Sequence, residues 1–387
     1  MAPTSTHIGI IGGGQLAWMM AKPAQELGLT LTIQTPHPSD PAVAVADHVF
    51  LGTVDDPQVT AAMAQGCDSI SFENEFIDLS GLKKLEAEGV RFYPQIGCLA
   101  PLLDKYSQRL YCQQIGLPTP KFVTIESQED LPKLEKQAAA VGWPLVLKTR
   151  RHGYDGQGTF ILKNIAELRQ TWQQLAYQPV LLEAFVPFER ELAVMVARCQ
   201  AGNIGIYPVV ESQQVNQVCQ RVIAPAAVDS AVAETVSAMA TRFVEHLGAT
   251  GIFGIELFLT AAGEVLVNEI APRTHNSGHY TLDACQTSQF AQQLRAVSGL
   301  PLGSTAMTCG CALMVNLLGF ESSNSDYSQQ RTRLAQLPQA HLYWYGKRQS
   351  RPGRKLGHIT LTFDEPQSSE TLQHWIHTVE SLWYPQI

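Results

Sequence analysis

Lys148-Thr-Arg-Arg-His-Gly153-Tyr-Asp-Gly156-Gln-Gly158 places three glycines directly after an apolar run that ends in a lysine. Residues 144–148 and 159–162 are apolar, so we expect two strands joined by a glycine-rich loop. Glycine lets backbone N–H groups come close to a phosphate, and Lys148 at a strand end can hold a fixed position against it. The alternative is a mobile hairpin loop whose charges are solvated. Because G-x-x-x-x-G-K-[ST] is absent, nucleotide binding here would need a class other than the Walker loop.

A second hairpin is predicted downstream, around a turn at Ala262-Gly263. A two-residue turn there pairs Thr260 with Val265. Continuing that register places Glu256 opposite Glu269 on one face of the pair. Two carboxylates in that arrangement repel, and Mg²⁺ fits between them because it takes carboxylate oxygens and keeps positions for phosphates and water. The alternative is a β-bulge that turns one of the two glutamates toward solvent.

The N-terminal region has the pattern of a doubly wound α/β unit. An apolar run at 7–11 is followed by a glycine turn and a helical stretch at 15–27. Further strands are predicted at 29–33 and 67–72, and we expect the unit to close near Tyr93-Pro94.

The glycine turn itself, Gly12-Gly-Gly14-Gln-Leu-Ala17, fits the dinucleotide-binding pattern G-x-G-x-x-A. That pattern needs an acid at the end of the second strand to bind a ribose, whereas here no acid follows that strand before Asp40. Three interpretations stay open: a dinucleotide site, a turn without a ligand, or a site that places another polar or anionic group at the helix N-terminus.

The rest of the chain alternates helices and strands without an internal repeat. A helix is predicted to begin near Asp104 and to end at the Gly/Pro-rich residues 116–120. Further strands are predicted at 180–183, 192–197 and 204–210, and further helices at 230–247 and 371–382.

Composition limits the possible classes of function. At 387 residues, with 45% hydrophobic and 16% charged residues, the chain can form two or three packed units. A formal net charge of −8 argues against a nucleic-acid partner, which selects a basic surface. No apolar run reaches the about 18 residues of a membrane helix, the first residues do not resemble a signal peptide, and the eight cysteines lack metal or redox spacing. We therefore expect a cytoplasmic protein without nucleic-acid or membrane partners.

The order of these parts, a phosphate loop with its lysine followed by paired glutamates, resembles the ATP-grasp superfamily. Within it, residues 268–279, Asn-Glu-Ile-Ala-Pro-Arg-Thr-His-Asn-Ser-Gly-His, are similar to the signature of the 5-(carboxyamino)imidazole ribonucleotide synthase family. Three further segments agree, namely Gly14-Gln-Leu16, 151–156 and 351–358. The matching segments follow one another in the family's order along nearly the whole chain.

The resemblance implies an α/β chain (α+β overall) with the ATP-grasp fold. It implies an N-terminal doubly wound pre-ATP-grasp domain at 1–100, an ATP-grasp domain of two lobes at 101–300, and a small β-rich C-terminal domain at 301–387. The flexible glycine loop of the ATP-grasp domain would be 153–158. The resemblance also implies a homodimer, and leaves open a handover of the product to a separate mutase.

The resemblance implies ATP and one or two Mg²⁺ ions as ligands, with Glu256 and Glu269 holding the metal. The ATP-binding residues it implies are Lys105, Lys148, the loop residues Gly153, Tyr154, Gly156, Gln157 and Gly158, the adenine-reading strand end Glu183, Ala184, Phe185 and Val186, the ribose ligand Glu191, and Asn268.

The implied reaction is carboxylation of 5-aminoimidazole ribonucleotide with bicarbonate through carboxyphosphate, in purine biosynthesis. Because carboxyphosphate hydrolyses readily, we expect the glycine loop to close over it. The residues implied for catalysis are Asp155, Arg273, His275 and Lys347, and those for substrate binding are Gln15, Leu16, Glu73, Asn276, Ser277, Lys347, Arg354 and Lys355. The alternative for His275 is a hydrogen-bonded structural histidine.

Residues 347–355 contain five cations, together with a proline and a glycine. Such a run is usually a solvated face. In an acidic protein, cations on a rigid turn suit a single 5′-phosphate, and we expect Lys347 and Arg354 to bind it.

Three positions depart from the family's pattern. Gln157 stands where the family has Arg or Lys, the acidic segment reads Glu73-Asn-Glu-Phe76 instead of Glu-Phe-Glu-Asn, and Ala271 replaces an asparagine that many ATP-grasp enzymes have. The rival functions are a formate-dependent glycinamide ribonucleotide transformylase, which Asn276-Ser-Gly-His279 disfavours, a nicotinamide-dependent oxidoreductase, and a non-catalytic nucleotide-binding protein.

Overall fold

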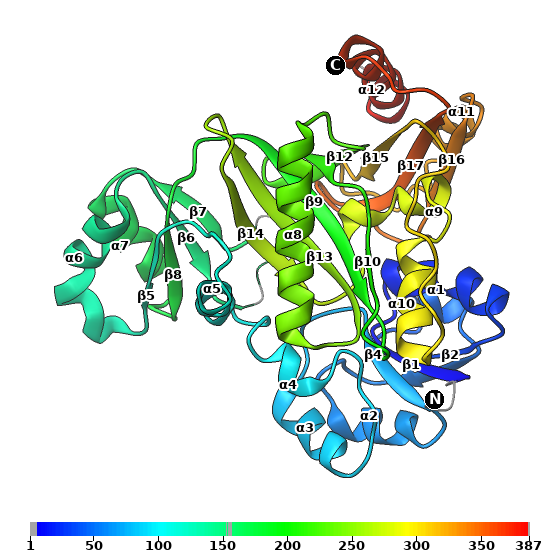
Figure 1. Cartoon of the computed structure of the whole chain (residues 1–387), viewed down its shortest axis with the longest axis horizontal. Coiled ribbons are helices and arrows are strands. Elements are labelled where there is room, and N and C mark those ends of the chain that lie inside the picture. Colours follow the sequence, from blue (N-terminus) through cyan, green and yellow to red (C-terminus); the bar gives the residue numbers. More distant parts are fainter. Residues whose placement is uncertain (1–5, 152, 154–156, 386–387) are drawn as a thin grey trace.

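The computed structural model describes residues 6–151, 153 and 157–385, and these residues form three β-sheets (Figure 1). The N-terminal sheet is parallel, with strand order β3-β2-β1-β4. Because β1 lies inside this sheet, the glycine turn that follows it opens at the sheet's carboxyl end. The elements of this part are β1 (His7–Ile11), α1 (Gln15–Glu26), β2 (Thr30–Thr35), η1 (Pro41–Ala44), β3 (His48–Leu51), α2 (Pro57–Ala64), β4 (Ser69–Phe72), α3 (Leu79–Ala87) and α4 (Ile96–Leu99).

The second sheet is antiparallel, has the order β5-β8-β6-β7, and stands apart as a small lobe at the left of Figure 1. Leu168 and Trp172 of α7 fill its core, and both are fully buried. The lobe's elements are β5 (Phe122–Ile125), η2 (Gln128–Lys133), α6 (Leu134–Val141), β6 (Leu145–Thr149), β7 (Thr159–Leu162), α7 (Ile165–Gln174) and β8 (Val180–Ala184). The strands predicted on either side of the glycine loop are thus confirmed as the antiparallel pair β6 and β7.

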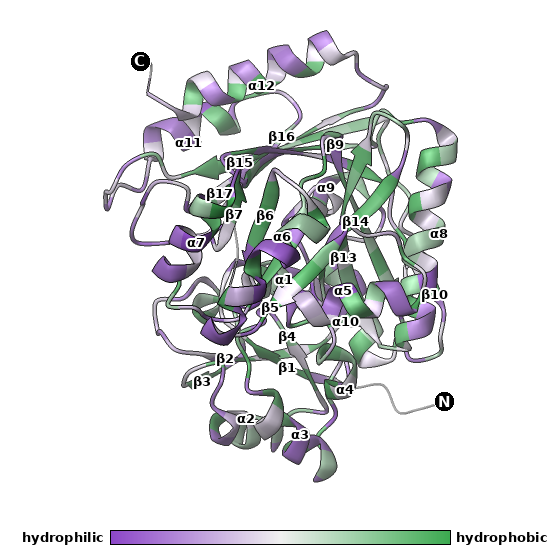
Figure 2. Cartoon of the chain, turned by 90° about the vertical axis from the view of Figure 1, so that its left-hand side faces the viewer, coloured by the Kyte–Doolittle hydropathy of each residue, from purple (hydrophilic) through white to green (hydrophobic). Residues whose placement is uncertain are grey.

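The third sheet has nine strands in the order β14-β13-β9-β11-β12-β15-β17-β16, with β10 paired to β9. Its first part comprises α5 (Lys105–Gln114), β9 (Phe188–Arg198), β10 (Ile204–Ile206), β11 (Val210–Val215), β12 (Val218–Ala224), α8 (Ser230–Leu247), β13 (Gly251–Thr260) and β14 (Val265–Ala271). Its second part comprises η3 (Asn276–Gly278), α9 (Thr281–Ala284), α10 (Gln289–Ser298), β15 (Cys311–Leu318), α11 (Ser328–Ala335), β16 (Ala340–Trp344), β17 (Lys355–Phe363) and α12 (Ser369–Trp383). Figure 2 shows β14 largely green, and α12 outside the strands with both purple and green turns.

The parts of the chain share secondary structure and core. The helix α10 packs on α1, and its Phe290, Leu294 and Val297 belong to the core of the N-terminal sheet. The strand β12 pairs with β15, so the large sheet continues from the central region into the C-terminal one. The predicted domain boundaries at 100 and 300 stay a prediction, and the regions that they separate share a core and a sheet.

The strand predicted at 204–210 is wrong in extent. The structure has two strands there, β10 and β11, which pair with different parts of β9. Pro208 lies in the irregular link between them and has no N–H to donate to a ladder. The helix predicted at 230–247 is confirmed as α8, which ends at Gly248 in a left-handed conformation (φ +65°).

The prediction for the glutamate hairpin is confirmed for the pairing of the two glutamates and is wrong near the turn. Glu256 lies opposite Glu269, as predicted. At the tip, however, Leu259 and not Thr260 pairs with Val265. The register shifts by one residue between Glu256 and Leu257, so Asn268 is the extra residue of a β-bulge. The bulge cancels the error in the predicted turn.

Among the helices of the described residues, none has the length and apolar character needed to cross a membrane.

The core beneath the large sheet depends on Phe243 of α8, which is fully buried and packs edge-on against Phe253. We predict that Phe243→Ala lowers the free energy of unfolding by about 3–5 kcal/mol, because it removes buried contacts and leaves a cavity. Chemical denaturation would measure this. Glu245→Ala, at an exposed position of the same helix, should change the value by less than about 0.5 kcal/mol; equal effects of the two changes would contradict the packing described.

Candidate active site

A cavity of about 940 Å³ lies where the small lobe faces the large sheet and the N-terminal turn. Most of the predicted site residues line it, although they come from distant segments of the chain. The lining includes Gln15, Leu16, Glu73, Lys105, Lys148, Gly153, Gln157, Glu183, Ala184, Phe185, Val186, Glu191, Glu256, Asn268, Glu269, Arg273, His275, Asn276 and Lys355. Gly158, Ser277, Lys347 and Arg354 do not line it. Tyr154, Asp155 and Gly156 lie outside the described residues.

Lys148 sits at the end of β6 with two partners. Its Nζ lies 2.7 Å from Glu183 Oε2 and donates to Asn268 Oδ1 at 2.9 Å. Burial lowers the pKa of Lys148, and the adjacent Glu183 opposes that shift. Burial would raise the pKa of Glu183, but Arg109 and Lys148 outweigh it and bring the value to about 2. Lys148 therefore meets the cavity beside a carboxylate that stays ionised at neutral pH.

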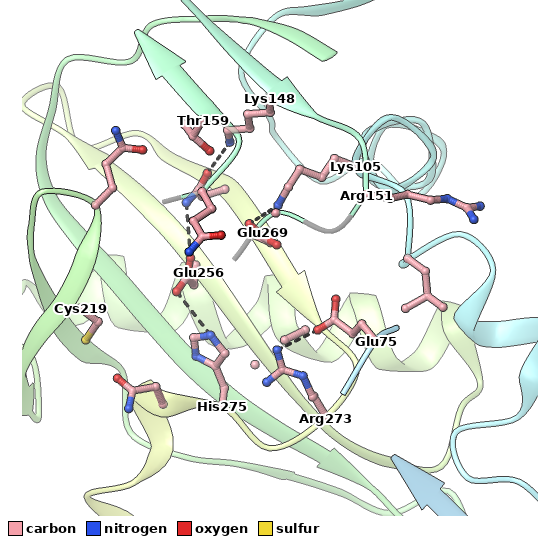
Figure 3. Close-up of a pocket in the computed structure, with 18 of the residues that line it drawn as sticks. Glu75, Lys105, Lys148, Arg151, Thr159, Cys219, Glu256, Glu269, Arg273 and His275 are labelled. Carbon is pink, nitrogen blue, oxygen red and sulfur yellow. Dashed lines mark hydrogen bonds and ion pairs between the residues drawn. The ribbon is translucent and has the colours of Figure 1, made fainter. Parts of the chain in front are cut away.

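The two glutamates of the hairpin line the same wall of the cavity, and each lies beside a basic side chain (Figure 3). Lys105 Nζ lies 2.5 Å from Glu269 Oε2, and His275 Nε2 lies 3.5 Å from Glu256 Oε1. Burial and the charge of Glu269 raise the pKa of Glu256 to about 7. Burial would also raise the pKa of Glu269, but Lys105 holds it below its usual value. The pair thus divides into one ionised and one readily protonated carboxyl.

This pair can hold a divalent cation. No group of three His, Cys, Asp or Glu side chains within metal-binding distance occurs among the described residues. Mg²⁺ does not require one, because it is commonly held by one or two carboxylates together with substrate phosphates and water. Burial and the nearby Glu256 raise the pKa of Glu191, a further carboxyl in the cavity, to about 7. The excess of carboxylates over cations on this wall favours a cation between Glu256 and Glu269.

The glycine turn holds a carboxylate of its own chain. The backbone N–H groups of Gly14 and Leu16 bond to Glu73, and a Cβ on Gly12 would lie 2.5 Å from Glu73 Oε2. Burial raises the pKa of Glu73 to about 7 despite these bonds and the nearby Arg273. A carboxyl group of the chain itself therefore lies at the helix N-terminus, as in the third interpretation, which places a polar or anionic group there.

Arg273 and His275 directly follow β14, the strand that carries Glu269. His275 Nδ1 lies 2.9 Å from Ser277 Oγ, so Ser277, which does not line the cavity itself, contacts a side chain that does. Gln289 holds the backbone of His275 from both sides, with its Oε1 accepting from the N–H at 2.9 Å and its Nε2 donating to the carbonyl at 2.8 Å. Arg273 pairs with Glu75 at 3.0 Å, which gives Glu75 a partner that the sequence did not suggest.

The residues of the basic run have different local partners, and their binding of a 5′-phosphate stays a prediction. Lys355 lines the cavity. Lys347 Nζ donates to Gln15 Oε1 at 2.5 Å and to the carbonyl of Lys355 at 2.8 Å, and so links the C-terminal region to the N-terminal turn. Arg354 donates to the carbonyl of Gln349 at 2.7 Å.

The structure adds residues that sequence reasoning missed. Gln214 of β11 lines the cavity and donates to Glu191 Oε2 at 2.6 Å. Phe188 and Phe258 stack at 4.7 Å between ring centroids beside the Glu183–Val186 strand end, where a flat base could pack. Strand β11 contains four polar residues in a row, Glu211 to Gln214, and such a run does not separate a ligand-binding amide from a solvated one.

Comparison with known proteins agrees with this architecture. The chain matches the ribonucleotide synthetase preATP-grasp domain at 5–101, the ATP-grasp domain at 110–290 and the phosphoribosylaminoimidazole carboxylase C-terminal domain at 312–371. These matches, with the glycine loop and the paired glutamates, define an ATP-grasp enzyme.

Relatives narrow the class further. The N5-carboxyaminoimidazole ribonucleotide synthase of Synechococcus elongatus is 55% identical, over 97% of this chain and 95% of its own length. The solved N5-carboxyaminoimidazole ribonucleotide synthetase of Thermotoga maritima is 38% identical with a TM-score of 0.84, over 97% of this chain and 98% of that one. The synthase of Aspergillus clavatus, solved with ADP and 5-aminoimidazole ribonucleotide, is 28% identical with a TM-score of 0.89, over 97% and 99%. The chain belongs to the N5-carboxyaminoimidazole ribonucleotide synthase family, ATP-dependent ligases of purine biosynthesis, which confirms the resemblance.

The repulsion between the hairpin carboxylates leads to a stability prediction. Since the pKa of Glu256 is raised from 4.5 to about 7 in the folded protein, its favourable contribution is complete below pH 4.5 and is lost as the pH rises through 7. We predict that Glu256→Gln raises the melting temperature of the ligand-free protein by about 2–4 °C at pH 8, and by less at pH 5.

Thermal denaturation at the two pH values would measure this. Glu264→Gln, at an exposed position of the same hairpin, is the control and should change neither value. A lower melting temperature for Glu256→Gln at pH 8 would show that the carboxylate stabilises the fold.

Proposed function

We propose that this chain carboxylates the exocyclic amine of 5-aminoimidazole ribonucleotide with ATP and bicarbonate, through carboxyphosphate. The observation that carries the proposal is the placement of Glu256 and Glu269 opposite each other, within one cavity that also contains Lys105 and Lys148. Phosphoryl transfer asks a protein mainly for positioning and for charge neutralisation, and this wall offers groups for both.

The proposed ATP site lies between the small lobe and the large sheet. Its base packs at the Glu183–Val186 strand end near Phe188, its ribose meets Glu191, and its phosphates meet Lys148, Lys105 and the glycine loop. Glu256 and Glu269 would hold one or two Mg²⁺ ions, which would neutralise the phosphate charge and leave the γ-phosphorus open to attack. Asn268, between the glutamates and Lys148, would keep these groups in register.

We assign the steps that involve bicarbonate and the amine to residues of the segment after β14. A bicarbonate oxygen attacks the γ-phosphorus, ADP leaves, and carboxyphosphate results. The exocyclic amine of the nucleotide then attacks the carboxyl carbon, the bond to the phosphate oxygen breaks, and inorganic phosphate leaves with its electron pair. Arg273 would bind the carboxylate oxygens of bicarbonate and His275 would accept the amine proton, with Asp155 and Lys347 assisting.

The nucleotide substrate would lie between the N-terminal turn and the C-terminal strands. Gln15, Leu16 and Glu73 line that end of the cavity, together with Asn276 and Lys355. Ser277 acts there through His275, and Lys347 and Arg354 would meet the 5′-phosphate. We further propose that the protein is a cytoplasmic homodimer that releases its product to a separate mutase.

The reaction is tested by ADP release from purified protein with Mg-ATP and bicarbonate, with and without 5-aminoimidazole ribonucleotide. We expect the nucleotide to stimulate ADP release strongly, and Glu269→Gln to reduce the stimulated rate at least about 100-fold, because charge neutralisation at the phosphates is lost. Formate with glycinamide ribonucleotide is the control pair and should give no stimulation. Stimulation by the control pair instead would contradict the proposed substrate and indicate the reaction of the transformylase.

The role of the basic run is tested separately. We predict that Lys347→Glu combined with Arg354→Glu raises the KM for 5-aminoimidazole ribonucleotide at least about tenfold, because each charge-assisted contact to a phosphate is lost and reversed. The KM for ATP should not change. Steady-state kinetics with each substrate varied would decide, and an unchanged nucleotide KM would move the 5′-phosphate site elsewhere.

A further inference from the structure

Arg109 is a buried cation that no step of the proposed reaction uses. It lies on α5, is 2% exposed, and does not line the cavity. Its Nε contacts Glu183 Oε1 of the small lobe, and its Nη2 donates to the carbonyl of Asn268 in the large sheet at 2.5 Å. One guanidinium outside the cavity therefore contacts both the small lobe and the large sheet, which form the two walls of the proposed ATP cleft.

The helix that carries Arg109 is itself fixed to the large sheet. Gln108 Nε2 donates to the carbonyl of Ile270 and its Oε1 accepts from the N–H of the same residue, both at 2.9 Å. At the start of the helix, Asp104 accepts from the N–H of Ser107. Arg109 is thus presented to Glu183 from a rigid support, at the bulge that sets the two metal-site glutamates opposite each other.

The contacts of Glu183 show what Arg109 does. One carboxylate oxygen contacts Arg109 and the other lies 2.7 Å from Lys148 Nζ. Arg109 thus neutralises part of the negative charge of Glu183, which would otherwise attract Lys148 alone. The same guanidinium holds the backbone of Asn268, whose side-chain oxygen accepts from Lys148 at 2.9 Å. Both acceptors of Lys148 are therefore held by Arg109.

We infer that Arg109 is a positioning residue for the nucleotide: it binds Glu183 and the Asn268 backbone so that Lys148 remains available to phosphate. The inference rests on the ATP site of the proposed function. Arginine suits this place because its planar group donates in two fixed directions, whereas a lysine ammonium is a single point charge.

The test is the affinity of Mg-ADP, measured by titration calorimetry, for the whole chain and its variants. In Arg109→Met, Glu183 retains Lys148 as its only cation, and we expect ADP to bind at least about tenfold more weakly, as for the loss of a charge-assisted contact. In Arg109→Met combined with Glu183→Gln, that competing charge is gone, and we expect the affinity to return to within about threefold of the parent. Arg109→Lys should fall between parent and Arg109→Met, and carries the test if the methionine variants do not fold.

A matched control is Arg221→Met, which removes another arginine–glutamate pair between two elements, that of Arg221 and Glu380. It should lower the melting temperature without changing ADP affinity. A purely structural role of Arg109 would give the same result, so unchanged ADP affinity in Arg109→Met or Arg109→Lys would overturn the inference. Weak binding that persists in the double variant would overturn it too. Because ADP binding needs neither bicarbonate nor 5-aminoimidazole ribonucleotide, failure of the proposed reaction would leave this result interpretable.

Discussion

The repulsion between Glu256 and Glu269 is the constraint around which the rest of the site is arranged. Strand pairing places them side by side on one face, where like charges are unfavourable. In the ligand-free protein the repulsion is met in two ways. Lys105 neutralises Glu269 by a direct ion pair, and the raised pKa of Glu256 lets that carboxyl take up a proton. A divalent cation would replace both the lysine and the proton. The same exchange would release Lys105 toward phosphate, so one ligand prepares the site for the other.

The bulge at Asn268 shows how much the sequence could tell and why it stopped there. The pairing of the two glutamates followed from alternation and an assumed two-residue turn. The real turn is longer, and Gly263 adopts φ +79° within it. The longer turn alone would shift the register of the two strands by one residue. The extra residue at Asn268 restores it. Bulges have no reliable signature in a single sequence, because the extra residue is stabilised by contacts from elsewhere. Here Arg109 and Lys148, more than 100 residues away along the chain, supply them.

Two other features were left open by the sequence for the same reason. The glycine turn was compatible with three interpretations because its partner, Glu73, approaches it from a different strand end. The cations of 347–355 are neighbours in sequence, and only the structure gives their partners: Lys347 contacts Gln15, and Arg354 contacts a backbone carbonyl. Local patterns gave the strands, the helices and the chemical types present. Which charges face each other was decided by the packing of separate segments.

The helix α10 connects the N-terminal sheet to the residues of the proposed chemistry. Phe290, Leu294 and Val297 anchor α10 to the N-terminal core. Its first residue, Gln289, bonds to both backbone groups of His275, and its Nε2 also lies 3.0 Å from His279 Nδ1. A buried amide with all its bonds made is rigid, since any rotation leaves polar groups unpaired at a cost of about 1–3 kcal/mol. The position of His275 beside Glu256 is therefore set by the N-terminal sheet, whose glycine turn lines the other end of the same cavity. The packing of α10 thus links the two ends of the site, and the ion pair of Arg273 with Glu75 adds a direct contact between them.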